Sequence, residues 1–146
     1  MTKKQGFTLI ELMVSISIIA ILTALATISF SSAQKKARDA RRTQDMKSLQ
    51  LAAEQYASSS NGTYPATTAV PWTIAGQPIL EAMPFEPKTG DPAYVLSIGA
   101  TPTTYCFCAT MENASAGNAT ATGIGCSMAT TATGNTGPYF CVKNRQ

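Results

Sequence analysis

The longest apolar run in the chain covers residues 7–30, and Glu11 is the only charged residue in it. Neither Pro nor Gly interrupts the run. An α-helix of this length would measure about 36 Å, which is enough to cross the hydrocarbon layer of a membrane. A carboxylate inside such a helix is costly unless an opposite charge compensates it. The pattern therefore predicts a membrane-spanning helix in which Glu11 pairs with an opposite charge from outside this helix.

The helical pattern continues beyond the span, over residues 31–60. No Pro or Gly occurs before Gly62, and apolar residues recur at spacings that place them on one helical face: Ala33, Ala37, Ala40, Met46, Leu49, Ala53 and Tyr56. A face made mostly of Ala suits the close approach of another layer of structure. We therefore predict one helix from Phe7 to about Ser58, with its first part in the membrane and its second part in an outer domain.

A basic cluster follows the span directly, and its members are Lys35, Lys36, Arg38, Arg41 and Arg42. Two of them have an acid four residues later, which predicts exposed ion pairs between Lys35 and Asp39 and between Arg41 and Asp45. The favoured interpretation of the cluster is a solvated face or a contact with lipid head groups. A contact between subunits comes second. DNA comes last, because no aromatic residue is interleaved to stack on bases.

The sequence predicts the end of the helix and an irregular segment after it. Asn61-Gly62 supplies a left-handed cap and Pro65 prevents continuation of the helix. Prolines then recur through residues 66–92, so little regular structure fits there. A short strand is expected at Trp72–Ile74, with Trp72 packed over the Ala-rich helix, and a helical turn is expected at Ile79–Met83.

Three strands are predicted in the remainder of the chain, at Ala93–Ile98, Thr103–Met111 and Pro138–Lys143. The second and third are separated by Glu112–Gly137, which has no hydrophobic period and is predicted to be a surface loop. A small antiparallel sheet with one face on the helix is the simplest arrangement. The predicted fold class is therefore α+β, a long N-terminal helix packed on a small antiparallel sheet.

All four cysteines, Cys106, Cys108, Cys126 and Cys141, lie in this outer part. An even number in a small exported domain favours two disulfides over a zinc site. Cys106 and Cys108 are two residues apart in a strand, so they face the same side and are not expected to bond to each other. Each should pair with Cys126 or Cys141. The pairing chosen here joins Cys108 to Cys126 and Cys106 to Cys141, and the other arrangement stays open.

Composition gives no support for catalysis. The chain has 146 residues, a net charge of +3, 13% charged residues and no His, so imidazole chemistry is excluded. The acids of the outer domain, Glu81, Glu86, Asp91 and Glu112, are scattered along the sequence. Neither a nucleophile–base arrangement nor a phosphate-binding loop is recognisable. We predict no enzyme activity, no cofactor and no metal site, calcium included.

Three Asn-x-Ser/Thr sequons are present, at Asn61, Asn113 and Asn118. The pattern marks an acceptor for N-linked glycans when it lies on the surface of an exported domain. By themselves these three short matches are weak evidence for glycosylation.

The N-terminal residues Lys-Lys-Gln-Gly-Phe-Thr-Leu-Ile-Glu-Leu, from Lys3 to Leu12, resemble the class III signal of type IV pilins and type II secretion pseudopilins. The motif joins a basic leader, a Gly, an aromatic residue, an apolar trio and a Glu directly before a span. The competing interpretations are a plain signal anchor and a secretory signal cleaved after Ala24-Leu25-Ala26. A secretory signal would leave Glu11 uncompensated in its apolar core. The segment Asn61–Pro65 also resembles the helix end of major pseudopilins.

The resemblance implies specific roles for three residues. Prepilin peptidase would cleave between Gly6 and Phe7 on the cytoplasmic side, and Phe7 would become the methylated N-terminus. Glu11 would then compensate the amino terminus of a neighbouring subunit during assembly, which agrees with the cost of leaving either charge unpaired in lipid. The partners implied are copies of this chain and related pilins, prepilin peptidase, an inner-membrane assembly platform and the membrane itself.

The function expected from this resemblance is structural, as a subunit of a type IV pilus or a pilus-like filament. The domains would be a leader at 1–6, a membrane and filament-core helix at 7–30, an amphipathic helix at 31–60 and a disulfide-tied head at 61–146. Lys3 and Lys4 place the N-terminus of the precursor in the cytoplasm, with the assembled filament periplasmic or extracellular. The alternatives are a type II secretion pseudopilin, acting as a periplasmic piston, and a membrane-anchored binding domain that never polymerises.

Overall fold

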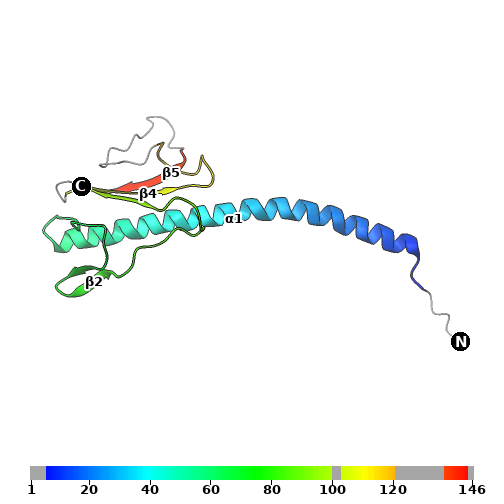
Figure 1. Ribbon diagram of the computed structural model, residues 1–146, viewed down its shortest axis with the longest axis horizontal. Coiled ribbons are helices and arrows are strands. Elements are labelled where there is room, and N and C mark those ends of the chain that lie inside the picture. The colour runs from blue at the N-terminus through cyan, green and yellow to red at the C-terminus, as the bar shows by residue number, and fades with distance from the viewer. Residues whose placement is uncertain (1–5, 100–102, 121–136, 145–146) are drawn as a thin grey trace. The chain divides into compact units, whose positions relative to one another are not determined.

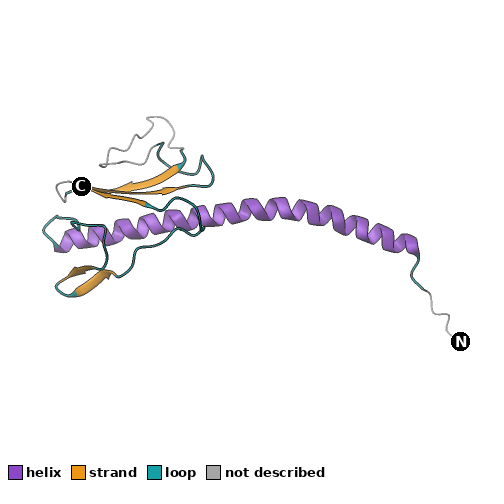
Figure 2. Cartoon of the chain, viewed as in Figure 1, coloured by secondary structure: helices purple, strands orange, loops and turns teal. Residues whose placement is uncertain are grey.

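The computed structural model describes residues 6–99, 103–120 and 137–144. Its elements, in chain order, are α1 (Leu9–Ser59), β1 (Trp72–Ile74), β2 (Gln77–Leu80), β3 (Val95–Ile98), β4 (Tyr105–Thr110) and β5 (Tyr139–Lys143) (Figures 1 and 2). The chain divides into two compact units, Met1–Lys35 and Lys36–Gln146, which are described separately below. The fold class is α+β, with a long N-terminal helix and small antiparallel sheets, as the sequence predicts.

Helix α1 is uninterrupted and ends where the sequence predicts. The backbone N–H of Gly62 donates to the carbonyl of Ala57 at 2.9 Å, which satisfies one of the last free carbonyls of the helix. Asn61 and Gly62 both take the left-handed conformation, with φ of 54° and 81°. Gly adopts this conformation without steric cost and Asn tolerates it better than most residues.

Strands β1 and β2 form an antiparallel hairpin with the turn at Ala75-Gly76, where both residues have positive φ. The short strand predicted at Trp72–Ile74 is confirmed. The helical turn predicted at Ile79–Met83 is wrong, because β2 ends at Leu80 and a bend follows it. The tight turn places residues 77–80 opposite β1, and pairing with that strand overrides the helical preference of the segment.

The three-stranded sheet has the order β3-β4-β5 and is antiparallel throughout. Alternate residues of the central strand, Tyr105, Phe107 and Ala109, join a hydrophobic core with helix residues. The helix contributes Met46, Leu49, Ala52, Ala53 and Ala57 to that core. In Figure 1 the sheet and the β1–β2 hairpin lie on different sides of the C-terminal part of α1. Trp72 belongs to the same core, as predicted, with its ring centroid 6.2 Å from that of Phe107.

The opposite face of β4 is also covered. Cys106, Cys108 and Cys141 form a second buried cluster with Ala119. The predicted surface loop is therefore wrong at residues 117–119, which bridge to Gly137 and Tyr139. A Cβ on Gly117 would lie 2.1 Å from the carbonyl oxygen of Tyr139, so only Gly allows this close approach. Residues 121–136 of the same predicted loop lie outside the described residues.

The helical face that packs in the domain differs at its start from the predicted one. Ala33, Ala37 and Ala40 are exposed, whereas Asp39 and Arg42 are buried together with Met46 and Leu49. The buried stripe therefore begins with charged residues and becomes apolar further along. Periodicity alone assigned the small apolar residues to the inner face of the helix, because it cannot identify a charged residue as buried.

Replacing Phe107 tests the central position of β4 in the core. Phe107 is 0% exposed and stacks on Tyr105 with ring centroids 4.7 Å apart. We expect Phe107→Ala to lower the free energy of unfolding by about 3–5 kcal/mol, since it leaves a cavity in a packed core. Phe85 is the matched control, because it is 72% exposed. The free energy of unfolding of both variants is measured by chemical denaturation. Similar decreases for Phe85→Ala and Phe107→Ala would contradict this description of the core.

Candidate functional site

The start of α1 is closed by a reciprocal cap between Thr8 and Glu11. The Thr8 backbone N–H donates to Glu11 Oε2 at 2.9 Å, and the Thr8 hydroxyl donates to the same oxygen at 2.8 Å. In return, the Thr8 hydroxyl oxygen accepts from the Glu11 backbone N–H at 3.3 Å. This is a capping box, and its Thr-x-x-Glu pattern was legible in the sequence. The carboxylate that the motif singled out therefore also fixes where the helix begins.

Glu11 lines a shallow hollow on the helix surface. The hollow has a volume of about 410 Å³ and is lined by Phe7, Ile10, Glu11, Val14 and Ser15. Only one oxygen of the carboxylate, Oε2, is used by the cap. Among the described residues no group donates a hydrogen bond to Oε1 of Glu11. The hollow thus combines apolar walls with one acceptor oxygen that is available to a donor from outside.

The apolar part of α1 is long and hydrophobic enough to cross a membrane. Its most apolar window has a mean hydropathy of 2.4, and none of that window is buried within the chain. Hydroxyl groups along it donate to helix carbonyls of the preceding turn: Ser15 to Glu11, Ser17 to Met13, Thr23 to Ile19 and Thr27 to Ala24. These bonds satisfy the hydroxyl donors internally, which lowers the cost of surrounding the helix with hydrocarbon.

The scissile bond proposed from the sequence lies just before this cap. Residues 6–8 are not helical and are exposed. A Cβ placed on Gly6 would meet no atom within 4 Å, so the surrounding fold does not itself require Gly at this position. Phe7 is 85% exposed. Phe7 and Glu11 line the same hollow, and the Gly6–Phe7 bond lies in an exposed, non-helical segment.

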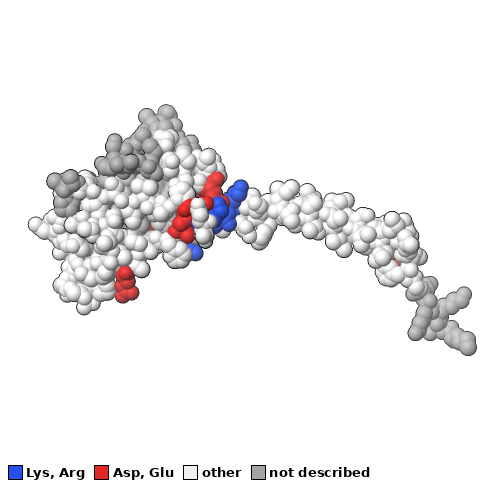
Figure 3. Space-filling model, viewed as in Figure 1, with Lys and Arg blue, Asp and Glu red and all other residues white. Residues whose placement is uncertain are grey.

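In the second unit, a buried arginine gathers the acids that the sequence presents as scattered. Arg42 is 0% exposed and its guanidinium contacts four carboxylates. Its Nη1 lies 2.7 Å from Asp39 and 3.2 Å from Glu112, and its Nη2 bonds to Glu86 and lies 2.9 Å from Asp91. Figure 3 shows acidic and basic side chains next to one another on the surface of the second unit. Three of the four acids that are scattered along the sequence therefore converge on Arg42, whereas the fourth, Glu81, is exposed.

The group also fixes the backbone around Glu112. Asp39 is only 5% exposed and accepts hydrogen bonds from the backbone N–H groups of Glu112 and Asn113, at 2.8 and 3.0 Å. Arg38 binds the Glu112 carboxylate through Nε and Nη2 in a bidentate pair. These bonds to Arg38 and Arg42 lower the pKa of Glu112 from its ordinary 4.5 to about 2. Helix α1 and the segment after β4 are thus joined by charge-assisted bonds.

The basic cluster is consequently not a single solvated face. Arg42 and Arg38 are engaged inside the domain, and Arg41 lies over the ring of Phe85, with Cζ 5.5 Å from its centroid. Lys35 and Lys36 are exposed. The predicted surface ion pairs are also wrong. Asp39 binds Arg42 rather than Lys35, and Asp45 accepts a hydrogen bond from the hydroxyl of Tyr94 at 2.6 Å instead of pairing with Arg41.

A second acid of the helix, Glu54, holds two tyrosines of the head. The hydroxyl of Tyr105 donates to Glu54 at 2.7 Å and that of Tyr64 donates at 3.1 Å. Burial and the neighbouring carboxylate raise the pKa of Tyr64 to about 12 and also raise that of Tyr105. Both phenols therefore stay protonated and remain donors over the physiological range of pH. Nothing in the sequence pattern pointed to this contact.

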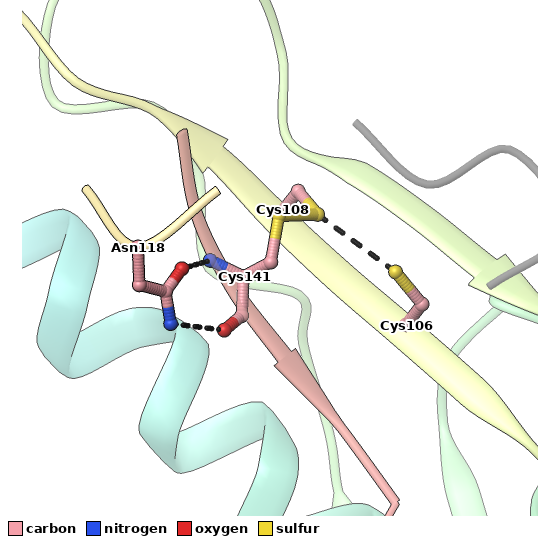
Figure 4. Close-up of a disulfide and its surroundings, with 4 residues drawn as sticks. All are labelled: Cys106, Cys108, Asn118 and Cys141. Carbon is pink, nitrogen blue, oxygen red and sulfur yellow. Dashed lines mark hydrogen bonds between the residues drawn. A yellow bond between two sulfur atoms is a disulfide. The ribbon is translucent and has the colours of Figure 1, made fainter. Parts of the chain in front are cut away.

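The cysteine pairing in the structure differs from the one chosen from the sequence. A disulfide joins Cys108 to Cys141, so both predicted bonds, Cys106 to Cys141 and Cys108 to Cys126, are wrong. The strand register explains the difference, because Cys108 lies directly opposite Cys141 while Cys106 lies opposite Lys143. Cys106 and Cys108 do face the same side, with their sulfur atoms 3.8 Å apart (Figure 4). Cys126 lies outside the described residues, and its pairing with Cys106 is the arrangement still open.

The comparison with known proteins agrees with the N-terminal geometry. Residues 1–27 match the family described as the prokaryotic N-terminal methylation motif. The chain therefore carries the class III signal of type IV pilins and pseudopilins. No curated protein and no solved structure matches the chain. The signal and the apolar helix together fit a precursor that is anchored in a membrane.

Removing the buried guanidinium tests the charge cluster. We expect Arg42→Met to destabilise the domain by about 3–5 kcal/mol, because it leaves the surrounding carboxylates without their buried counter-charge. Arg41→Met is the matched control on the same helix, since Arg41 is exposed and its contact with Phe85 contributes only about 0.5–1 kcal/mol. Urea denaturation measures both. Equal effects of the two substitutions would show that the carboxylates do not depend on Arg42.

Acid titration tests the same cluster through the protonation of one of its carboxylates, Glu112. The pKa of Glu112 is lower in the folded chain than in the unfolded chain, so its contribution to stability is fully present above pH 4.5. That contribution is lost as the pH falls from 4.5 toward 2. We expect Glu112→Gln to be less stable than wild type at neutral pH and the gap to narrow across this window. A gap that stays constant down to pH 2 would contradict the assigned pairing.

Proposed function

We propose that the chain is a structural subunit of a type IV pilus or of a related filament. It would be made as a membrane-anchored precursor, processed at its N-terminus and assembled through α1. The observation that carries this proposal is the match of residues 1–27 to the methylation motif, with Glu11 held at the first turn of an exposed apolar helix. No reaction is proposed for the chain itself.

Processing would occur between Gly6 and Phe7. The exposed, non-helical backbone at residues 6–8 supports this, because a peptidase must bind a scissile segment in an extended form. Cleavage there would create a new amino terminus at Phe7, immediately before the capping box. Methylation of that amine leaves a charged nitrogen, so its need for a counter-charge in an apolar setting is retained.

Glu11 would supply that counter-charge to a neighbouring copy. The free Oε1 and the hollow formed with Phe7, Ile10, Val14 and Ser15 fit an incoming ammonium group with an apolar surround. An ammonium or carboxylate buried alone costs several kcal/mol, whereas the pair costs much less. The exposed apolar side chains of the helix would be covered by lipid in the precursor and by neighbouring helices in the filament.

The domain arrangement follows from the same proposal. Residues 1–6 would be the leader, 7–30 the helix of the membrane and filament core, 31–60 the amphipathic helix, and 61–146 the head. The partners would be other copies or related pilins, prepilin peptidase and an assembly platform in the inner membrane. The N-terminus of the precursor would be cytoplasmic. DNA is not proposed as a partner, because Arg38 and Arg42 are committed to the fold.

Replacing Glu11 with Gln tests the assembly role. We expect Glu11→Gln to be inserted in the membrane as wild type is, and filament formation to fall to background, because the amide carries no charge to offset the neighbouring amine. Glu81→Gln is the control, since Glu81 is an exposed acid of the head. Membrane fractionation and electron microscopy of sheared filaments are the measurements.

Several outcomes would contradict or refine the proposal. Normal filaments from the Glu11→Gln variant would rule out charge compensation at this position. A mature chain that begins at Thr27, found by mass spectrometry, would show that Glu11 is discarded with a secretory signal. Filaments recovered from the cell surface would favour a pilus, and filaments confined to the periplasm would favour a secretion pseudopilus. A chain that never polymerises would instead fit the anchored binding domain.

A further inference from the structure

One of the three sequons differs from the other two in its geometry. Asn113 is exposed, and its Oδ1 accepts hydrogen bonds from the Ser115 backbone N–H at 3.2 Å and from the Ser115 hydroxyl at 2.9 Å. The amide nitrogen, Nδ2, donates no hydrogen bond among the described residues. The two residues that define the sequon are therefore in contact, and the atom that would accept a sugar is open to solvent.

The sequon at Asn118 is unsuitable in the folded chain. The Asn118 side chain binds β5 at both of its polar atoms: Nδ2 donates to the carbonyl of Cys141 at 2.9 Å, and Oδ1 accepts from the Cys141 N–H at 2.7 Å. Figure 4 shows this pair of bonds beside the disulfide. A sugar on Nδ2 would have to break the first bond and displace the segment that covers β5.

The sequon at Asn61 lacks the contact that distinguishes Asn113. Asn61 lies in the cap of α1 with a positive φ of 54°. The hydroxyl of Thr63 donates to the carbonyl of Ser60 at 2.6 Å, so it is used in the cap and is not directed to the Asn61 amide. Asn61 is exposed as Asn113 is, so the difference between the two sequons is that the hydroxyl of the Asn61 sequon binds the helix cap instead of the amide.

We propose that Asn113 is a site of N-linked glycosylation and that Asn61 and Asn118 are not modified in the folded chain. The donor would be an oligosaccharide carried on a lipid pyrophosphate. This proposal rests on the proposed function in one respect: residues after the span must lie outside the cytoplasm to meet such a donor. Nothing in the proposal depends on filament assembly.

The geometry favours the transfer step. Nδ2 of Asn113 would attack the anomeric carbon of the donor sugar, forming the C–N bond as the bond from that carbon to the pyrophosphate oxygen breaks. The lipid pyrophosphate leaves with the bonding electron pair, and one Nδ2 proton passes to a base of the transferase. The Ser115 hydroxyl withdraws electron density through Oδ1, which makes the Nδ2 protons more acidic.

The position of Asn113 is fixed without its side chain. Its backbone N–H donates to Asp39 Oδ2 at 3.0 Å, and its carbonyl accepts from the Ala116 N–H at 2.9 Å. Any residue except Pro at position 113 can keep the first bond. Substitution of the side chain therefore removes the acceptor without releasing the segment from the buried acid, and a glycan on Nδ2 leaves both bonds intact.

The test is a transfer reaction on the purified, folded full-length chain. The chain is incubated with a lipid-pyrophosphate-linked oligosaccharide and an oligosaccharyltransferase that accepts Asn-x-Ser/Thr, and sites are mapped by mass spectrometry. We expect one modified site, Asn113, and its complete loss in Asn113→Gln and in Ser115→Ala. Ser115→Thr retains the hydroxyl and should retain modification. Asn61→Gly, which fits the positive φ, and Thr120→Ala should leave it unchanged.

The reduced and denatured chain is the matched control for the role of the fold. It should be modified at Asn61 and Asn118 as well as at Asn113, because unfolding frees the Asn118 amide from Cys141 and the Thr63 hydroxyl from the helix cap. The proposal is overturned if the folded chain is modified at Asn61 or Asn118, or if Asn113 is unmodified in it, whatever the denatured chain shows. Filament assembly by the Asn113→Gln variant separates this result from the proposed function, which stands or falls with Glu11.

Discussion

The structure of the outer unit depends on burying one positive charge. A guanidinium with no exposed surface is tolerated only when carboxylates surround it, and Arg42 has four. One comes from its own helix, Asp39, and the other three from segments far along the chain. The arginine thus fixes where the segment before β3 and the segment after β4 meet α1. Other packed arrangements of these loops would leave the charge uncompensated.

The two parts of α1 belong to one continuous helix, but their side chains have different surroundings. Over residues 7–30 the large apolar side chains are exposed, and the only charged residue of that stretch, Glu11, is bound by the cap at Thr8. In the second unit the inner face changes from ionic contacts near Arg42 to hydrogen bonds at Glu54 and close packing at Ala53 and Ala57. The small side chains there allow the sheet to approach the helix backbone.

Much of this fold was predictable because it depends on local pattern. The uninterrupted helix, its end at Gly62, and the strands around Phe107 follow from periodicity and from the positions of Gly and Pro. The Arg42 cluster was not predictable, since three of its four carboxylates lie 44 to 70 residues away in the sequence. Acids that appear dispersed along a chain give no sign that they converge on one cation.

In the candidate site, too, the local contacts were predictable from the sequence and the long-range contacts were not. Thr8 and Glu11 are three residues apart in the sequence, so the sequence motif and the structure describe the same local feature. The disulfide was mispredicted because it depends on the register between β4 and β5, which a one-residue or two-residue shift would alter. The match of residues 1–27 to the methylation motif extends no further than that local part.

The separation of Arg42 from three of its four carboxylates has a consequence for the order of folding. Asp39 lies three residues before Arg42, so these two charges come together as soon as the helix forms. Glu86, Asp91 and Glu112 lie 44 to 70 residues further along the chain. A guanidinium with one carboxylate is too costly to bury, whereas one with four is tolerated. Arg42 can therefore be enclosed only after both loop segments have reached the helix.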